Sequence, residues 1–226
     1  MKVCFFSHGS GTNQDGATLS MLNVMEELAN RGHEVIGIMA KDVNLEYMKK
    51  IKNVKFYFIP SYDMRLDLSR TGREVELKYF VKNKLNWFIM QRTLKIFKNE
   101  NIDIIHINGL NNGIGAMIAQ KLGIPYVWHI RQLMEEDLHQ RLYNQKKVWP
   151  MVKSANAVIA ISKAVKEKFE KEFNREITVV YNGVPVEKYQ INNHSIFDEE
   201  LVKMVLPGRI VEGKGQLEAA KALKYL

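Results

Sequence analysis

The amino-acid sequence predicts an α/β protein built on a doubly wound, mostly parallel β-sheet. Short runs rich in Val, Ile and Phe recur along the chain, and most of them are bounded by turn residues. Segments of helical length separate these runs. The runs are apolar at successive positions, so both of their faces need to be buried. This pattern is typical of parallel strands covered by helices on both sides of the sheet.

Eight apolar runs are the expected strands. In chain order they read "KVCFFS", "EVIGIM", "VKFYFIP", "IDIIHIN", "PYVWHI", "NAVIAIS", "ITVVYN" and "KMVLPG". Their alternation with segments of helical length predicts a doubly wound sheet.

Three helices between these runs have recognisable start or stop signals. The first runs from Gly16 to Arg31, and Gly32 follows where a left-handed cap would fall. A second covers Asn112 to Leu122 and stops at Gly123. In the third, Ser162 can cap the segment "KAVKEKFEKEF".

A longer helix is predicted from Arg73 to Lys98, and it carries two apolar stripes instead of one. One stripe contains Val81, Leu85, Phe88, Ile89 and Ile96, and the other contains Tyr79, Trp87, Met90, Leu94 and Phe97. Two stripes need two surfaces to pack against. We favour packing of both against neighbouring helices. The alternative is a membrane-facing stripe flanked by Lys78, Lys82, Lys84, Lys95 and Lys98.

Two segments lack a helical or strand period. Ser61 to Glu74 carries charges of both signs, and we expect a mobile loop there. The polar stretch "VEKYQINNHSIFDEE" is typical of a linker between domains. We therefore predict a first domain over residues 1–183, a linker over 184–200, and over 201–226 only the first strand and helix of a second, truncated domain.

Charge and cysteine content limit the environment and the partners. The formal net charge of +8 favours an acidic partner, which could be a nucleotide diphosphate, an anionic membrane or a nucleic acid. The sequence has no finger, basic zipper or aromatic RNA-binding signature, so a nucleic acid is not expected. The single cysteine, Cys4, cannot form an internal disulfide, and the N-terminus does not resemble a secretory signal. We expect a cytoplasmic protein.

Candidate site residues follow the expected strands, because ligands bind at the carboxyl ends of strands in doubly wound sheets. In "HGSGTNQDGAT", Gly11 and Gly16 let the backbone approach a ligand closely, and the amides of the following helix favour a phosphate. In "WHIRQL", His129 can exchange a hydrogen bond near neutral pH and Arg131 can clamp a phosphate or carboxylate. A lone histidine of this kind can equally be structural.

Two further residues could contact a ligand at this edge. His106 lies in "IIHIN", and the same structural alternative applies to it. Ser162 ends a strand and caps a helix, so its structural role is sufficient without a ligand. The six histidines show no metal-ligand spacing with Cys or carboxylates, and we expect no metal site.

The C-terminal segment contains a G-x-x-x-x-G-K pattern from Gly208 to Lys214. A phosphate-binding P-loop continues with Ser or Thr, which holds the magnesium ion, but Gly215 follows here. The pattern therefore does not favour a P-loop hydrolase. Arg209 and Lys214, beside the free amides of a helix start, could instead bind a diphosphate without a metal, or they could be a solvated surface pair.

Taken in order, these segments resemble family 4 glycosyltransferases, retaining enzymes that use nucleotide sugars. "DGATLSMLNVMEELANRGHEV" looks like the loop, helix and strand that open the family's first domain, and "NIDIIHING", "WHIRQL" and "NAVIAISKAVKEKF" look like its later segments. "VVYNGVPVEKY" and "LPGRIVEGKGQLEAAKAL" resemble its hinge and the start of its second domain. The resemblance implies the GT-B fold, which consists of two facing Rossmann-like domains.

The resemblance also implies roles for particular residues. Gly16 would contact the donor phosphate through its backbone, and Arg209 and Lys214 would pair with the phosphate charge. His129 would be the catalytic-site residue near the transferred sugar and the acceptor. In this family no protein nucleophile is generally assigned, the leaving diphosphate assists the acceptor hydroxyl, and no metal or other cofactor is required.

The resemblance covers nearly all of this chain, but the chain covers about half of a two-domain enzyme. It implies an acceptor-binding domain with the C-terminal domain missing, inactive alone and acting in polysaccharide or glycoconjugate assembly. The partners would be a nucleotide sugar and a glycan or lipid-linked acceptor, with peripheral contact to the inner face of an anionic membrane. The alternative is a noncatalytic module that binds an anionic lipid or glycan, or that pairs with a separate subunit.

Overall fold

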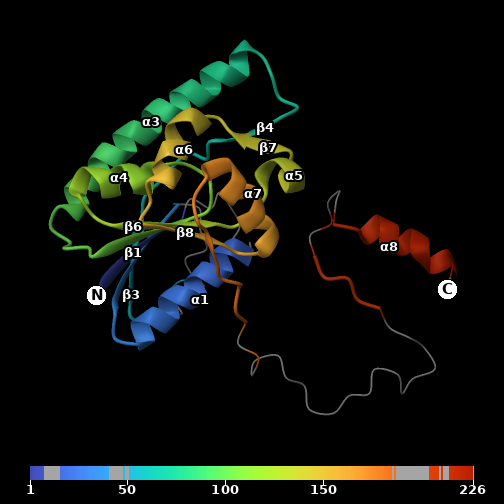
Figure 1. The fold of residues 1–226 in the computed structure, drawn as a ribbon, viewed down its shortest axis with the longest axis horizontal. Helices are drawn as coiled ribbons and strands as arrows, with labels where there is room; N and C mark the ends of the chain where they lie inside the picture. The colour runs from blue at the N-terminus through green and yellow to red at the C-terminus, as the bar shows by residue number, and fades with distance from the viewer. Residues whose placement is uncertain are drawn as a thin grey trace. The chain divides into compact units, whose positions relative to one another are not determined.

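The computed structural model describes residues 1–7, 16–40, 48, 51–184, 186, 204–208, 210 and 214–225. The chain divides into two compact units, Met1–Val184 and Pro185–Leu226. Gly11 and Arg209 lie outside the described residues. The first unit contains the sheet and the hydrophobic core (Figure 1).

The first unit is built on a seven-stranded parallel sheet in the order β3-β2-β1-β5-β6-β8-β9. The strands are β1 (Lys2–Ser7), β2 (Glu34–Met39), β3 (Val54–Phe58), β5 (Ile104–Asn108), β6 (Tyr126–Ile130), β8 (Ala157–Ala160) and β9 (Thr178–Val179). The chain starts in the middle of the sheet, builds outward to one edge, and then crosses back to build the other edge. This order confirms the doubly wound α/β class predicted from the sequence.

Helices cover both faces of this sheet, but unequally. They are α1 (Gly16–Asn30), α3 (Arg73–Phe97), α4 (Ile114–Leu122), α5 (Met134–Leu138), α6 (Gln145–Lys153) and α7 (Lys163–Phe173). On one face α1 packs on Phe5 and Val35 through Met21, Leu22 and Met25. The other face is covered by helices that include α3, α4, α6 and α7, which enclose the larger of the two core clusters (Figure 1).

The predicted ends of three helices are confirmed to within two residues. Gly32 and Gly123 have positive φ angles of 84° and 67°, which let the chain turn sharply after α1 and α4. Ser162 caps α7, because its side chain accepts a hydrogen bond from the Val165 amide.

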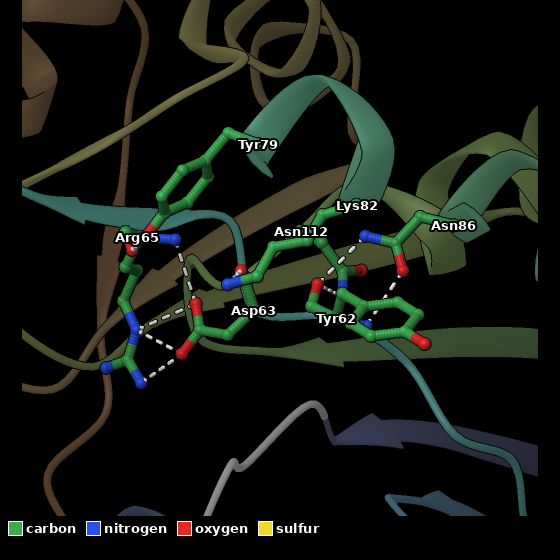
Figure 2. A network of polar contacts seen from close by, with 7 residues as sticks. All are labelled: Tyr62, Asp63, Arg65, Tyr79, Lys82, Asn86 and Asn112. Carbon is green, nitrogen blue, oxygen red and sulfur yellow. Dashed lines mark hydrogen bonds and ion pairs between the residues drawn. The ribbon is translucent and has the colours of Figure 1, made fainter. Parts of the chain in front are cut away.

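The segment after β3 is ordered by polar contacts, and the expectation of an irregular loop was wrong for part of it. Arg65–Asp67 form strand β4, which pairs antiparallel with β7 (Gln140–Leu142). Figure 2 shows the contacts beside it. The amide of Asn86 on α3, which is 3% exposed, donates to the Tyr62 carbonyl and accepts from the Tyr62 amide, both at 2.8 Å. The Asn112 side chain reaches the same carbonyl at 3.3 Å.

Arg65 and Lys82 extend this network (Figure 2). Arg65 pairs with Asp63 at 2.5 Å, and its carbonyl accepts a hydrogen bond from the Tyr79 hydroxyl. Lys82 donates to the Asp63 carbonyl at 3.3 Å. The segment is therefore fixed to one side of α3 by side chains far away in the sequence.

The outer side of α3 corrects a second expectation. Met90, Leu94 and Phe97 of one predicted stripe are buried against the sheet and α4. Val81, Leu85, Phe88 and Ile96 of the other stripe are exposed, as is Trp87. The favoured interpretation, that both stripes pack within the domain, was therefore wrong for four of the five residues of this outer stripe, whereas Ile89 packs partly against the core.

The described part of the second unit contains α8 (Gln216–Ala222) and a short 3-10 helix, η2 (Leu223–Tyr225). The helix that was expected after Gly215 is present. The strand expected in "KMVLPG" is not observed for residues 204–208, which have no regular secondary structure. A strand needs neighbours in a sheet, and no strand is described in residues 185–226 to pair with it.

Candidate functional site

Polar side chains converge at the carboxyl edge of the sheet, where four elements end or begin. Ser7 ends β1 and Asn108 ends β5, and these two residues are register partners. Arg131 follows β6, and all three are at most 6% exposed. Buried polar groups need hydrogen-bond partners, and Asn108 and Arg131 find them in each other and in α1.

Arg131 is the centre of this cluster. Its Nε donates to Asn108 Oδ1 at 2.7 Å, and its Nη1 donates to Ser20 Oγ at 3.0 Å and to Asn182 Oδ1 at 2.7 Å. The Ser20 hydroxyl also donates to Asn182 Oδ1 at 2.8 Å. The Asn108 amide in turn reaches the Ala17 carbonyl at 3.5 Å. The guanidinium thus joins β5, the start of α1 and the segment after β9.

His129 and His106 lie next to Arg131 on neighbouring strands. The two rings meet edge to face with centroids 5.4 Å apart, and His106 also stacks on Phe5 at 4.7 Å. The Nε2 atoms of both rings are buried without a hydrogen-bond partner in the described part of the chain. Both rings line a cavity of about 380 Å³ between the sheet and α1. The other residues that line this cavity are mostly apolar.

Both histidines are held in the neutral form. Burial lowers the pKa of His129 to about 2, with smaller contributions from the Arg131 charge and from His106. Burial and the Arg131 charge lower the pKa of His106 to about 3. Neither ring therefore carries charge at neutral pH, and both can act only as hydrogen-bonding or packing groups.

The start of α1 completes this edge. The first turn of α1 contains no acidic residue, whereas Asp15 directly precedes the helix in the sequence. At the positive end of the helix dipole, the carboxylate of Asp15 is the nearest negative charge in the sequence. A Cβ built on Gly16 would meet no atom within 4 Å among the described residues. None of the described residues therefore blocks the approach of a ligand to the backbone at Gly16.

The structure brings together some of the sequence-predicted residues and separates others. His106, His129 and Arg131 line one cavity, and Arg131 connects them to α1, which Gly16 begins. The side chain of Ser162 caps α7 by accepting a hydrogen bond from the Val165 amide, as the structural alternative predicts. Lys214 precedes α8 in the second unit.

Four polar residues of the cluster, Ser7, Ser20, Asn108 and Asn182, were missed in the sequence. Asn108 ends "IIHIN" and Asn182 follows "VVY", so both stand at the carboxyl ends of expected strands and could have been found by that rule. Ser20 lies inside a helix and gives no such signal. No group of three or more His, Cys, Asp or Glu side chains that could hold a metal ion occurs among the described residues. Within the same residues, no helix is long and apolar enough to cross a membrane.

Comparison with known proteins identifies the arrangement. A family model described as Glycosyltransferase Family 4 matches residues 14–188. No curated protein sequence matches the chain. Among solved structures, HepE of Anabaena in complex with UDP and glucose is similar to 85% of this chain, with a TM-score of 0.60 and 16% identity. The same protein has been solved with UDP-glucose.

Two other solved structures share this fold. MurG of Acinetobacter baumannii matches 85% of this chain with a TM-score of 0.54 and 16% identity. UGT89C1 of Arabidopsis thaliana matches 80% of this chain with a TM-score of 0.52 and 11% identity. The chain spans about half the length of these structures, namely 47% of HepE, 50% of MurG and 49% of UGT89C1. Its α/β fold corresponds to one half of a GT-B glycosyltransferase.

Proposed function

Because the chain belongs to glycosyltransferase family 4, we propose that it is the acceptor-side domain of a retaining enzyme that moves a sugar from a nucleotide sugar to a glycan or lipid-linked acceptor. The observation that carries the proposal is the convergence of His129, Arg131 and the start of α1 at one edge of the sheet. The complex of HepE with UDP-glucose supports a nucleotide sugar as the donor.

The donor diphosphate would lie at the N-terminus of α1. The amides at the start of an α-helix and the dipole of this 15-residue helix favour a bound anion. Gly16 leaves room for the phosphate to approach the backbone. In this proposal Arg209 and Lys214 supply the positive charges that balance the diphosphate.

The reaction would break the bond between the anomeric carbon of the donor sugar and the diphosphate oxygen. The acceptor oxygen forms the new bond on the same face of the sugar, and its proton passes to the leaving diphosphate. The neutral ring of His129 would donate or accept a hydrogen bond with the sugar or the acceptor, so it positions groups and does not supply charge.

We place this reaction in the cytoplasm, in the assembly of a polysaccharide or glycoconjugate. The buried free thiol of Cys4 fits a reducing compartment. A lipid-linked acceptor would bring the domain to the inner surface of a membrane.

The proposal is tested on the product of the complete reading frame that encodes residues 1–226. The purified protein is incubated with a panel of nucleotide sugars and with free and lipid-linked glycans, and release of nucleoside diphosphate is measured. We expect release with one donor, and NMR of the product should show that the anomeric configuration of the donor is kept. His129→Ala should lower kcat at least about tenfold, whereas Lys171→Ala on the exposed side of α7 should leave it unchanged.

Two outcomes would contradict the proposal. One is the absence of nucleoside diphosphate release with every donor and acceptor pair. The other is a His129→Ala variant with the kcat of the unsubstituted protein. Activity that arises only after a separately encoded donor-binding chain is added would support the transfer reaction but identify this chain as one subunit of a split enzyme.

A further inference from the structure

Basic residues are separated from acidic residues along two segments of the first unit. Residues 77–99, which cover most of α3, contain six Lys or Arg residues and no Asp or Glu. Residues 138–166, which include β7 and α6, again contain six Lys or Arg and no Asp or Glu. The rest of the chain carries all 25 acidic residues against 21 of the 33 basic ones, so these two segments hold the excess of positive charge.

The fold brings these two segments together. β4 leads into α3 and pairs with β7, which leads into α6. A groove of about 740 Å³ lies between them, with Phe80 and Trp87 of α3 on one side and Lys146 and Lys147 on the other. We call the exposed side of α3 from residue 77 to 96, together with residues 141–147, the basic aromatic face.

Large apolar side chains are exposed on this face. Leu77 is 64% exposed, Phe88 59% and Trp87 47%. Trp87 and Phe88 contact each other edge to face, with ring centroids 5.0 Å apart. Exposing this much apolar surface on a 25-residue helix is costly in water unless something covers it.

Cations lie among these apolar side chains instead of on the opposite side of the helix. Lys84 Nζ lies 5.6 Å from the centroid of the Phe80 ring. A second hollow of about 550 Å³, beside Leu85 and Phe88, is bordered by Arg92 and Lys95. The inner side of α3 is already used, because Met90, Leu94 and Phe97 pack in the core. The outer side is therefore a separate surface of the helix.

We propose that the basic aromatic face docks on the surface of a lipid bilayer that contains anionic lipids. Trp87 and Phe88 would enter the boundary between headgroups and acyl chains, and Lys84, Arg92 and Lys147 would face the lipid phosphates. The absence of carboxylates from both segments removes the repulsion that an anionic surface would otherwise meet. A helix of 25 residues is about 37 Å long, which allows α3 to lie flat along the membrane plane.

A bilayer fits this face better than a nucleic acid does. A nucleic acid would use the cations and the aromatic rings, but it would leave the aliphatic side chains of Leu77, Val81 and Ile96 without a partner. These side chains are all exposed on the same helix. The inference deepens the proposed function, which brings the domain to a membrane, by assigning that contact to this surface. Its test uses no sugar nucleotide, so it can fail without the transfer reaction failing.

The test is co-sedimentation of the 226-residue chain with vesicles, in the absence of any sugar nucleotide. Vesicles of phosphatidylcholine alone are compared with vesicles that contain about 30 mol% phosphatidylglycerol. We expect binding to the anionic vesicles only. The double variant Trp87→Ser/Phe88→Ser should weaken this binding at least about tenfold, and so should Lys84→Glu/Lys147→Glu.

The matched control is the double charge reversal Lys52→Glu/Lys171→Glu. It changes the net charge as much as Lys84→Glu/Lys147→Glu does, but on exposed positions outside the basic aromatic face. We expect it to change the affinity by less than about twofold. Circular dichroism of each variant should match that of the unsubstituted chain, since all six side chains are outside the core clusters.

Fluorescence quenching by lipids that carry a nitroxide on the acyl chain reports the depth of Trp87. The other two tryptophans pack elsewhere: Trp128 is fully buried and Trp149 contacts α7. Quenching should therefore disappear in Trp87→Phe. The proposal is wrong if the chain does not bind anionic vesicles or if Trp87→Ser/Phe88→Ser binds as well as the unsubstituted chain. It is equally wrong if Trp87→Ser/Phe88→Ser abolishes a dimer in sedimentation analysis without any effect on vesicles.

Discussion

At the scale of single residues, the side chain of Arg131 joins parts of the chain that are far apart in sequence. Its contacts to Ser20, Asn108 and Asn182 span 111, 23 and 51 residues along the chain. A buried guanidinium is costly to desolvate, and these acceptors offset that cost. We therefore regard Arg131 as a positioning residue that sets the distance between α1 and the strands beside it.

Removal of this guanidinium should destabilise the first unit. Arg131→Ala leaves Asn108 and Asn182 without their charged donor, and we expect the free energy of unfolding to fall by about 2–4 kcal/mol. Arg131→Lys keeps the charge but cannot reproduce the two-nitrogen geometry, so an intermediate loss is expected. Urea denaturation of the two variants, and of Lys171→Ala as an exposed control, measures the free energy of unfolding. Equal stability of Arg131→Ala and the control would contradict the role.

The neutral state of His129 predicts a pH dependence of stability. Burial, with Arg131 and His106 contributing, lowers the pKa of this ring to about 2, whereas an unfolded histidine has a pKa of about 6.5. The unfolded state therefore binds more protons between these values. The stability that the neutral ring contributes is complete above pH 6.5 and is lost as the pH falls below 6.5.

We expect His129→Gln to show a weaker loss on acidification than the unsubstituted chain. Between pH 7 and pH 5, the difference in the change of the unfolding free energy should be about 1–2 kcal/mol. Urea titrations at the two pH values provide the measurement. Identical pH dependence in both proteins would mean that His129 does not resist protonation.

The sequence identifies some site residues because they follow strands. Arg131 comes directly after an apolar run and His129 is the last residue but one of that run, so both stand at the carboxyl end of β6, where the strand rule expects ligands. The hydrogen-bond partners of Arg131 could not all be predicted in the same way. Ser20 is one of several polar residues in α1, and only the packing of α1 on the sheet selects it.

At the scale of elements, local sequence signals and distant contacts decide different parts of the structure. Glycines after α1 and α4 and the Ser162 cap of α7 act over a few residues, and the predicted ends of these helices are confirmed. Strand β4 depends on pairing with β7, about 75 residues later in the chain, and on the Asn86 amide. Because this pairing depends on a distant segment, the local sequence does not predict the strand, and the segment was expected to be irregular.

Gly37 in β2 gives a test of how closely α1 packs on the sheet. A Cβ at this position would lie 2.6 Å from Met25 Cε and 2.7 Å from an atom of the Phe56 ring. These distances are too short, so neighbouring side chains must move. We expect Gly37→Ala to lower the unfolding free energy by about 1–3 kcal/mol.

The matched control is Gly183→Ala, because a Cβ at Gly183 would meet no atom within 4 Å among the described residues. Its unfolding free energy should stay within about 0.5 kcal/mol of the unsubstituted chain. If the two variants are equally stable in urea, the contact between α1 and β2 is looser than described.

At the scale of the whole molecule, the described core belongs to the first unit. The buried residues of both core clusters lie between Cys4 and Ile177, and α8 has no buried residue. The fold class could be predicted from the sequence because seven apolar runs behave as parallel strands. The strand predicted from the eighth run is absent in residues 204–208. The prediction was wrong there because the sequence pattern does not reveal whether a neighbouring strand is present.

We predict that the first unit carries the stability of the chain. A shortened chain of residues 1–184 should keep the cooperative thermal transition of the 226-residue chain, with a midpoint within about 4 °C, because each kcal/mol shifts the midpoint by a few degrees. Differential scanning calorimetry of both proteins tests this. Loss of cooperative unfolding in the shorter chain would show that residues 185–226 are needed for the core.

The bond between Arg131 and Asn182 also has a mechanical consequence. The hydrogen bond from Arg131 holds Asn182 at the edge of the sheet, two residues before the first unit ends at Val184. The path of the chain is therefore fixed as far as Asn182, and Gly183 is the next residue, with no described atom within 4 Å of a Cβ built on it. The same guanidinium also bonds to Ser20 in α1, so one side chain holds both this helix and the last residues of the first unit to the sheet.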